Sequence, residues 1–202
     1  MDTLRDAQRQ LDQRLALAGP EDTCRGLFFN VVLDGLKDLA GHDVEFICRR
    51  AAGERKFTDF FSYPVSGFIR LGIAALPLVG ARLGGDEAVL RWMGTHSTRS
   101  FLNSVAGKTA LKLAGNDIKR FVNQVPISYR AAVSYGERQV VWTGETQGRV
   151  IFKRDFMPPA YHEGILSQVL ETLGGRNVRV RGQATSALDS VYELSWDKAA
   201  GR

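Results

Sequence analysis

The sequence predicts an α+β protein: an N-terminal helical bundle packed on one face of a C-terminal antiparallel sheet of about five strands with one inserted helix. Two observations support this class. Apolar residues recur every three or four positions until about residue 125, which is helical spacing, and alternate at every second position from residue 127. Pro158 and Pro159 then introduce a further helical pattern between strand patterns. We therefore expect helices first and a sheet afterwards.

Length and composition set the class of protein. A chain of 202 residues is typical of one domain, so we expect a single domain over residues 1–202. Hydrophobic residues at 44% and charged residues at 24% are ordinary values for a folded protein. The net charge of +5 is spread along the chain, so we expect no specific nucleic-acid surface. Two cysteines and no secretory leader pattern favour the cytoplasm.

Residues 1–18 form the first predicted element, an amphipathic helix. Leu4, Leu11 and Leu15 recur on one side, together with Ala7 and Ala18, and charged residues occupy the other side. This stripe either docks on the body of the protein or pairs with its copy in a dimer.

The helical part continues over residues 21–125. The pattern predicts helices over 24–39, 43–52 and 65–83, with Pro77 placed to kink the third. Its uncharged run, 71–81, covers 11 residues, whereas a membrane span needs about 20. We expect a buried helix and no membrane span.

A long apolar helix over residues 86–114 is the predicted centre of the fold. Asp86 and Glu87 favour its start, because carboxylates stabilise the positive end of a helix. Gly115 favours its end. Ser97, Ser100, Ser104 and Gly107 recur at spacings of three and four, and so leave one face without bulk.

This strip of small residues has two interpretations. It permits close packing of another helix, or it lines a pocket with hydroxyl groups. In the second case, an apolar ligand pocket lies between the helices 65–83 and 86–114. Its candidate residues are Phe68, Trp92, His96, Ser97, Ser100, Phe101 and Ser104.

The sheet part spans residues 127–197. Strands are predicted over 128–135, 139–143, 149–153, 177–181 and 191–196, with a helix over 160–173. Alternation places the aromatic residues on the helix-covered face and a basic row on the polar face, Arg130, Arg149, Lys153, Arg179 and Arg181. The candidate interaction surface joins part of this row to the N-terminal stripe: Leu4, Leu11, Leu15, Arg130, Arg179 and Arg181.

No motif for catalysis or metal binding is found. Gly107-Lys108-Thr109 resembles the end of a phosphate-binding loop, but Leu102 stands where that loop needs glycine. The three histidines and two cysteines lack the spacing of a zinc site. His96 is more typical of a hydrogen-bonded interior residue than of a haem ligand. We therefore expect no enzyme activity, no metal and no cofactor.

Six segments stand out as a set: Cys24–Asn30, Phe60–Pro64, Ser104–Lys108, Tyr129–Ala132, Phe156–Gly164 and Tyr192–Trp196. Together they resemble a family of uncharacterised myxobacterial proteins, DUF2378, that occurs as many paralogues. The order of elements is also similar to 4-vinyl reductase sensor domains, haem nitric-oxide sensors and small TRAPP subunits, which enclose an apolar cavity. The metal-binding cysteines and the Tyr-x-Ser-x-Arg haem motif of these relatives are missing, since Ser134–Arg138 has a different spacing.

The resemblance implies a non-enzymatic sensory or regulatory module in bacterial signalling that binds a small apolar molecule or lipid. The alternative is an adaptor or scaffold that acts through protein contacts. We expect a cytoplasmic protein, a homodimer, and signalling proteins as partners; haem or a bound lipid has no direct support in the residues.

Overall fold

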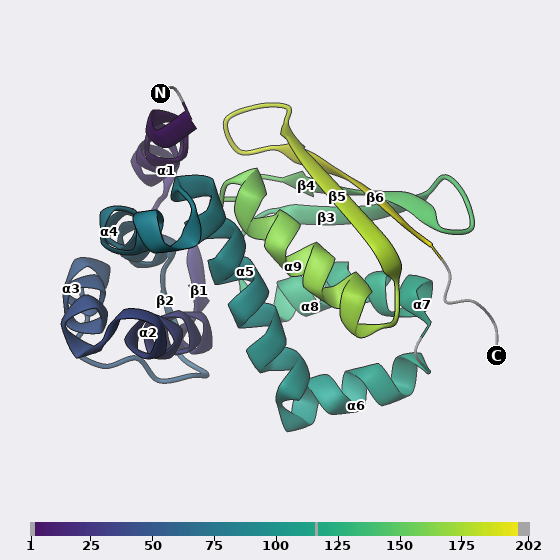
Figure 1. Ribbon diagram of the computed structural model, residues 1–202, viewed down its shortest axis with the longest axis horizontal. Helices are drawn as coiled ribbons and strands as arrows, with labels where there is room; N and C mark the ends of the chain where they lie inside the picture. The colour runs from purple at the N-terminus through teal and green to yellow at the C-terminus, as the bar shows by residue number, and fades with distance from the viewer. Residues whose placement is uncertain (1–2, 116, 198–202) are drawn as a thin grey trace.

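Helices and one small strand pair form the N-terminal part of the chain (Figure 1). The computed structural model describes residues 3–115 and 117–197, with side chains from residue 6 on. The helices are α1 (Thr3–Leu17), α2 (Gly26–Ala40), α3 (His42–Ala52), α4 (Val65–Leu83), α5 (Asp86–Asn103), α6 (Val105–Ala114), α7 (Ile118–Val122) and α8 (Val125–Ala132). Strands β1 (Thr23–Arg25) and β2 (Ser62–Pro64) pair antiparallel.

The C-terminal part is an antiparallel sheet in the order β3-β4-β6-β5. Its strands are β3 (Glu137–Trp142), β4 (Gln147–Lys153), β5 (Arg176–Ala184) and β6 (Ser190–Asp197), and α9 (Pro159–Thr172) is inserted between β4 and β5. Figure 1 shows α9 lying beneath the sheet and beside α5. The predicted α+β class, with helices on one face of a sheet and one inserted helix, is confirmed.

Alternation along the strands separates a buried face from an outer face. Val150 on β4 lies opposite Tyr192 on β6, and both point into the core. Arg149 lies opposite Glu193 in the adjacent register position, on the outer face. The aromatic residues Trp142, Phe152, Tyr192 and Trp196 all belong to the buried cluster under the sheet or pack against it, as their alternation predicts.

Two hydrophobic clusters hold the two parts together. The first joins α1, α2, α3, α4 and α5 to Ala160 and Tyr161 of α9, and the second joins Leu102 of α5 and residues of α6, α7 and α8 to α9 and the sheet. Helix α4 matches the predicted range 65–83 and is the one described helix that is long and apolar enough to span a membrane. More than half of its apolar window is buried, so it is a core helix here.

Helices α5 and α9 touch through their main chains. A Cβ atom added to Gly94 on α5 would lie 1.9 Å from the carbonyl oxygen of Tyr161, and one added to Gly164 on α9 would lie 2.0 Å from that of Arg91. Only glycine allows such an approach. Close packing through small residues thus occurs in this helix, but at Gly94 rather than along the predicted serine strip.

Two predicted elements are corrected. The predicted strand over 128–135 is helix α8, because Pro126 lies in its first turn, where proline favours a helix start. The described sheet consequently has four strands instead of five. The predicted helix 86–114 is divided at Ser104, whose hydroxyl accepts a hydrogen bond from Gly107 N and caps α6.

Candidate functional site

A cluster of charged and polar side chains is buried where the helices meet the sheet. It consists of Arg138 on β3, Asp155 before α9, His162 in α9 and Tyr129 on α8. Asp155 forms an ion pair with Arg138 and a hydrogen bond with His162, and the His162 Nε2–Asp155 Oδ1 distance is 2.7 Å. The His162 Nδ1 atom lies 3.0 Å from the Tyr129 hydroxyl. We call these four residues the buried charge cluster.

Aromatic rings surround the Arg138 guanidinium. Its central carbon lies 4.6 Å from the Tyr129 ring centre and 5.2 Å from that of Phe152, and the side chain is 2% exposed. A desolvated cation over aromatic faces is stabilised electrostatically. Burial alone would raise the pKa of Asp155, but His162 and Arg138 hold that pKa well below its usual range. The cluster is therefore an internal ion pair that joins β3 to α9.

The order Tyr129–His162–Asp155 resembles a nucleophile, base and carboxylate. Two features argue against catalysis. Burial raises the pKa of Tyr129 well above its ordinary value, which disfavours the phenolate. Both ring nitrogens of His162 already have partners within the protein, so no lone pair is free to accept a proton from a substrate. The arrangement is suited to fixing α8 and α9 against the sheet.

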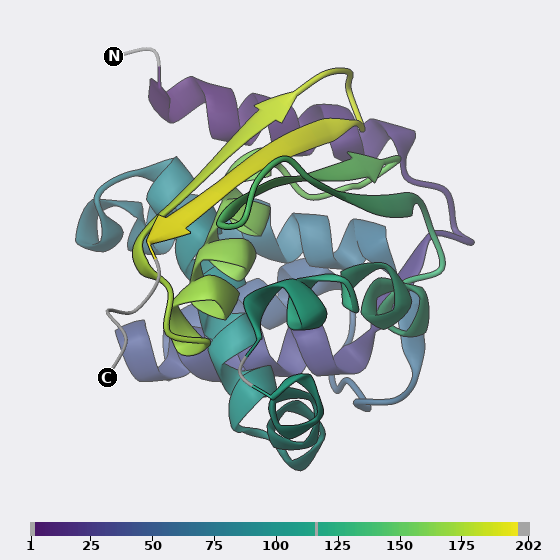
Figure 2. The same cartoon turned by 90° about the vertical axis from the view of Figure 1, so that its right-hand side faces the viewer.

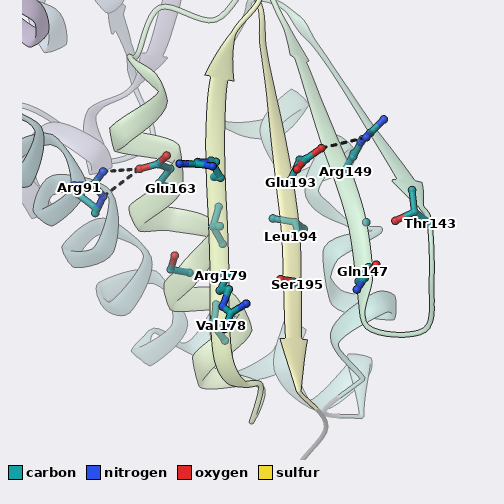
Figure 3. A pocket seen from close by; sticks show the side chains of 14 residues that line it. Arg91, Thr143, Gln147, Arg149, Glu163, Val178, Arg179, Glu193, Leu194 and Ser195 are labelled. Atoms are coloured by element: carbon teal, nitrogen blue, oxygen red, sulfur yellow. Dashed lines mark hydrogen bonds and ion pairs between the residues drawn. The ribbon is translucent and has the colours of Figure 1, made fainter.

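A second feature is an open depression of about 850 Å³ around the edge strand β5, lined by the sheet and by residues of α5 and α9 (Figure 3). Glu163 reaches this region from α9, accepts a hydrogen bond from Gly182 N at 2.8 Å and pairs with Arg91 at 2.6 Å. Arg149 and Glu193 pair across β4 and β6 at 3.1 Å. Figure 3 also places Arg179 in this region. Because the depression is open and lined by charges, it is suited to contact a polar partner.

The structure separates the predicted pocket residues. Phe68 is in the core, 5.3 Å from the Phe29 ring and 5.9 Å from that of Tyr161. Ser97 is buried beside Tyr161. Trp92 and His96 stack at 5.1 Å, with the His96 ring over Gly35.

The remaining pocket candidates, Ser100, Phe101 and Ser104, are exposed near the end of α5. Between α4 and α5 the space is occupied by fully buried side chains, including Leu71, Val89 and Met93. The serine strip and the aromatic residues therefore do not line one common space in this structure.

The predicted interaction residues are also divided. Leu11 is fully buried and Leu15 is half-buried, so the N-terminal stripe docks on the body of the protein. The side chain of Leu4 lies outside the described residues. Arg179 and Arg181 are exposed together on β5, in the depression, whereas Arg130 is exposed on α8, away from the sheet.

The histidines do not fit a haem ligand. His162 has both nitrogens engaged, and burial against α2 lowers the pKa of His96, whose Nε2 lies against Gly35. His42 lies exposed at the start of α3, outside both hydrophobic clusters. In the described part of the chain, no group of three or more potential ligands is placed to hold a metal ion. Burial also raises the pKa of the Cys48 thiol to about 12, which disfavours a thiolate ligand.

Sequence reasoning missed the buried charges, although a signal was present. Arg138 shares the inward register of β3 with Val140 and Trp142, so alternation placed it in the core. Arg14 lies three residues after Leu11 on the apolar side of α1, and its side chain is buried. In both cases a charged residue occupies a position where the periodicity predicts an apolar one.

Comparison with protein families gives one match. The model described as "Protein of unknown function (DUF2378)" matches residues 17–197. No curated protein is similar enough in sequence to be matched.

Several solved structures share the fold. An Fe(II) unliganded H-NOX protein from K. algicida has a TM-score of 0.66 and 12% identity, and the alignment covers 88% of this chain and 99% of that one. The Fe(II)NO H-NOX protein from S. oneidensis has a TM-score of 0.66 and 13% identity, with coverage of 86% and 99%. An oxygen complex of an H-NOX domain related to soluble guanylate cyclases has a TM-score of 0.65 and 12% identity, with coverage of 86% and 95%.

Proposed function

Because this chain belongs to the DUF2378 family and has the fold of H-NOX domains, we propose that it is a non-enzymatic sensory or regulatory module in bacterial signalling. In this proposal it binds a small molecule or lipid and needs no haem. The observation that carries the proposal is the shared fold, which extends over nearly the whole length of domains whose names record bound NO or oxygen. A shared fold gives only the class of function, so the ligand has to follow from this chain's own residues.

The residues of this chain favour a ligand other than haem. The histidine nitrogens are engaged or lie outside the core, and the buried charge cluster fills the junction between helices and sheet with paired polar groups. A haem iron needs a free axial ligand. We expect haemin added to the purified protein to keep the spectrum of haemin in buffer. A 1:1 complex with a shifted Soret band would contradict this part of the proposal.

Ligand binding itself is tested on protein purified from its own host. We expect native mass spectrometry to show a bound non-protein mass, and we expect removal of that molecule to lower the melting temperature, since a ligand stabilises the state that binds it. The absence of a bound mass, together with no thermal shift from fatty acids or small aromatic compounds, would refute it.

The alternative function is an adaptor that acts through protein contacts, with a homodimer as its simplest assembly. Arg179 and Arg181 at the open depression favour this alternative, because exposed charges on one face guide partner choice. Reversing both charges, Arg179→Glu with Arg181→Glu, should then abolish partner capture or dimer formation. Arg55→Glu with Lys56→Glu, an equal charge change at exposed positions between α3 and β2, is the control.

A further inference from the structure

Helix α1 carries a buried arginine on the side that docks against the core. Arg14 is 3% exposed, and its Nη1 atom donates to the main-chain oxygen of Gln10 at 3.3 Å. Its Nε atom is buried and has no hydrogen-bond partner among the described residues. A buried guanidinium with an unused donor is costly unless another group compensates it.

Two more buried polar atoms without partners lie in the same region. One is Gln10 Oε1, one helical turn before Arg14 on α1, and the other is the hydroxyl of Tyr192 on β6, which has the Ser190 side chain as a polar neighbour. Tyr192 is fully buried and lies within electrostatic range of Arg14. Figure 2 shows α1 crossing the end of the molecule where the β5–β6 strands turn. Three unsatisfied groups thus occur where α1 covers the core.

The nearby charges do not balance Arg14. Asp155 is the carboxylate within electrostatic range of Arg14, but its oxygens are already used by Arg138, His162 and the main-chain nitrogen of Met157. Glu163 acts on Tyr192, but its oxygens bind Arg91 and Gly182 N. Arg14 and Arg138 therefore share the one carboxylate of Asp155, because Asp22, which is also buried, pairs with Arg154. This excess of positive charge favours an anion.

We propose that Arg14, Gln10 and Tyr192 form a binding site for a small organic anion that α1 covers. This proposal rests on the proposed ligand-binding function and specifies its ligand class. Arg14 Nε and the Tyr192 hydroxyl can donate to a carboxylate, and Gln10 Oε1 can accept from a neighbouring hydroxyl or amino group. The chemistry recognised is a carboxylate next to such a donor, as in a hydroxy acid. Arg14 and Gln10 precede the region 17–197 that the family model matches, whereas Tyr192 lies within it.

Pairing inside the protein would not remove the need for an anion. Rotation of the Gln10 side chain toward Arg14 would satisfy one donor and one acceptor. It would leave the Tyr192 hydroxyl with Ser190 as its polar neighbour, and it would add no negative charge. The charge imbalance therefore distinguishes a ligand site from a local rearrangement.

The test compares Arg14→Met with Arg9→Met on the same helix. Arg9 is exposed and pairs with Asp6 at 2.5 Å, so it is a matched control for loss of charge on α1. In ligand-free protein, we expect Arg14→Met to raise the melting temperature by about 2–4 °C, because methionine removes an uncompensated buried charge. Arg9→Met should change it by less than about 2 °C. A lower melting temperature for Arg14→Met would show that Arg14 is satisfied without a ligand and would overturn the proposal.

Lactate, acetate and inorganic phosphate are the probes, each compared with chloride at equal ionic strength. Lactate should raise the melting temperature of the wild-type protein and of Arg9→Met, and it should leave Arg14→Met unchanged. An equal response of wild type and Arg14→Met, no response to any probe, or a response to phosphate alone would overturn the carboxylate site. A host-derived molecule that stays bound to Arg14→Met in native mass spectrometry would refute this site and leave the proposed function standing.

Discussion

Asp155 and His162 lie seven residues apart in the sequence, and their side chains meet inside the core at 2.7 Å. The same carboxylate pairs with Arg138 on β3, so one buried aspartate joins the first strand of the sheet to the inserted helix. Such a pair is costly to break, because removing one partner leaves the other charge buried.

Substitution of this aspartate should destabilise the protein strongly. Asp155→Asn removes the negative charge and leaves Arg138 without a counterion, so we expect the free energy of unfolding to fall by about 3–5 kcal/mol. Denaturant unfolding followed by circular dichroism measures the change. Glu193→Gln, which breaks an exposed pair with Arg149, is the control and should cost at most about 1 kcal/mol. Equal losses in the two variants would contradict the role assigned to the buried charge cluster.

The ionisation of Asp155 makes the stability of the protein depend on pH. The folded-state pKa of Asp155 lies below its unfolded value of about 3.9, so its contribution is complete above that pH and is lost as the pH falls below it. We expect the free energy of unfolding to decline more steeply between about pH 5 and 3 in the wild type than in Asp155→Asn. Parallel curves would indicate that other carboxylates account for the acid sensitivity.

The contact between α5 and α9 predicts a strong effect of one methyl group. Gly94→Ala would place a Cβ atom against the Tyr161 carbonyl, and we expect a loss of about 3 kcal/mol or more as the helices separate. Gly72→Ala on α4 is the matched control. Its Cβ would meet neighbours at ordinary distances of 3.7 and 3.8 Å, so the substitution should be neutral or stabilise by up to about 1 kcal/mol. A tolerated Gly94→Ala would mean that the two main chains do not touch.

Substitutions of Ser104 and Ser100 distinguish a structural role of the serine strip from a ligand-binding role. Ser104→Ala removes the cap of α6 and should cost about 1 kcal/mol, whereas Ser100→Ala, on the exposed side of α5, should have almost no effect on stability. Thermal unfolding of both variants measures this difference. If either substitution instead weakened binding of a co-purified molecule without changing stability, the pocket interpretation would be supported.

The sequence predicted most elements because their periodicity is strong. The range 65–83 agrees with α4, and the helix predicted over 160–173 differs by one residue at each end from α9. The strand over 149–153 lies within β4. In these segments an apolar face is buried against one neighbouring layer, so local pattern and tertiary environment agree.

Two errors came from single residues whose effect depends on context. Pro126 stands just before the alternating pattern that predicts a strand over 128–135, but a proline is also compatible with the first turn of a helix, and here it lies in the first turn of α8. Ser104 was interpreted as one of a row of small helical residues, but its side chain caps a new helix. A serine side chain can hydrogen-bond to the main chain and so interrupt a helix, and the spacing of residues alone does not show whether the helix continues or ends there.

The candidate site was harder to predict, because its polar members come from separate elements. Arg14 and Tyr192 come within electrostatic range of each other only when α1 docks on α4 and α5. Their inward positions can be read from helix and strand periodicity, but the lack of a partner is a property of the folded state. The pairing of Asp155 with Arg138 likewise depends on how β3 and the start of α9 lie in three dimensions.

The main-chain contact between α5 and α9 has a mechanical consequence. Neither helix can slide along the other without a collision at Gly94 or Gly164, so a displacement of α5 carries α9 with it. Short connections tether α9 to β4 and β5, and the strands then follow. A movement of the N-terminal helices that displaces α5 would therefore also tilt β4 and β5 in the sheet.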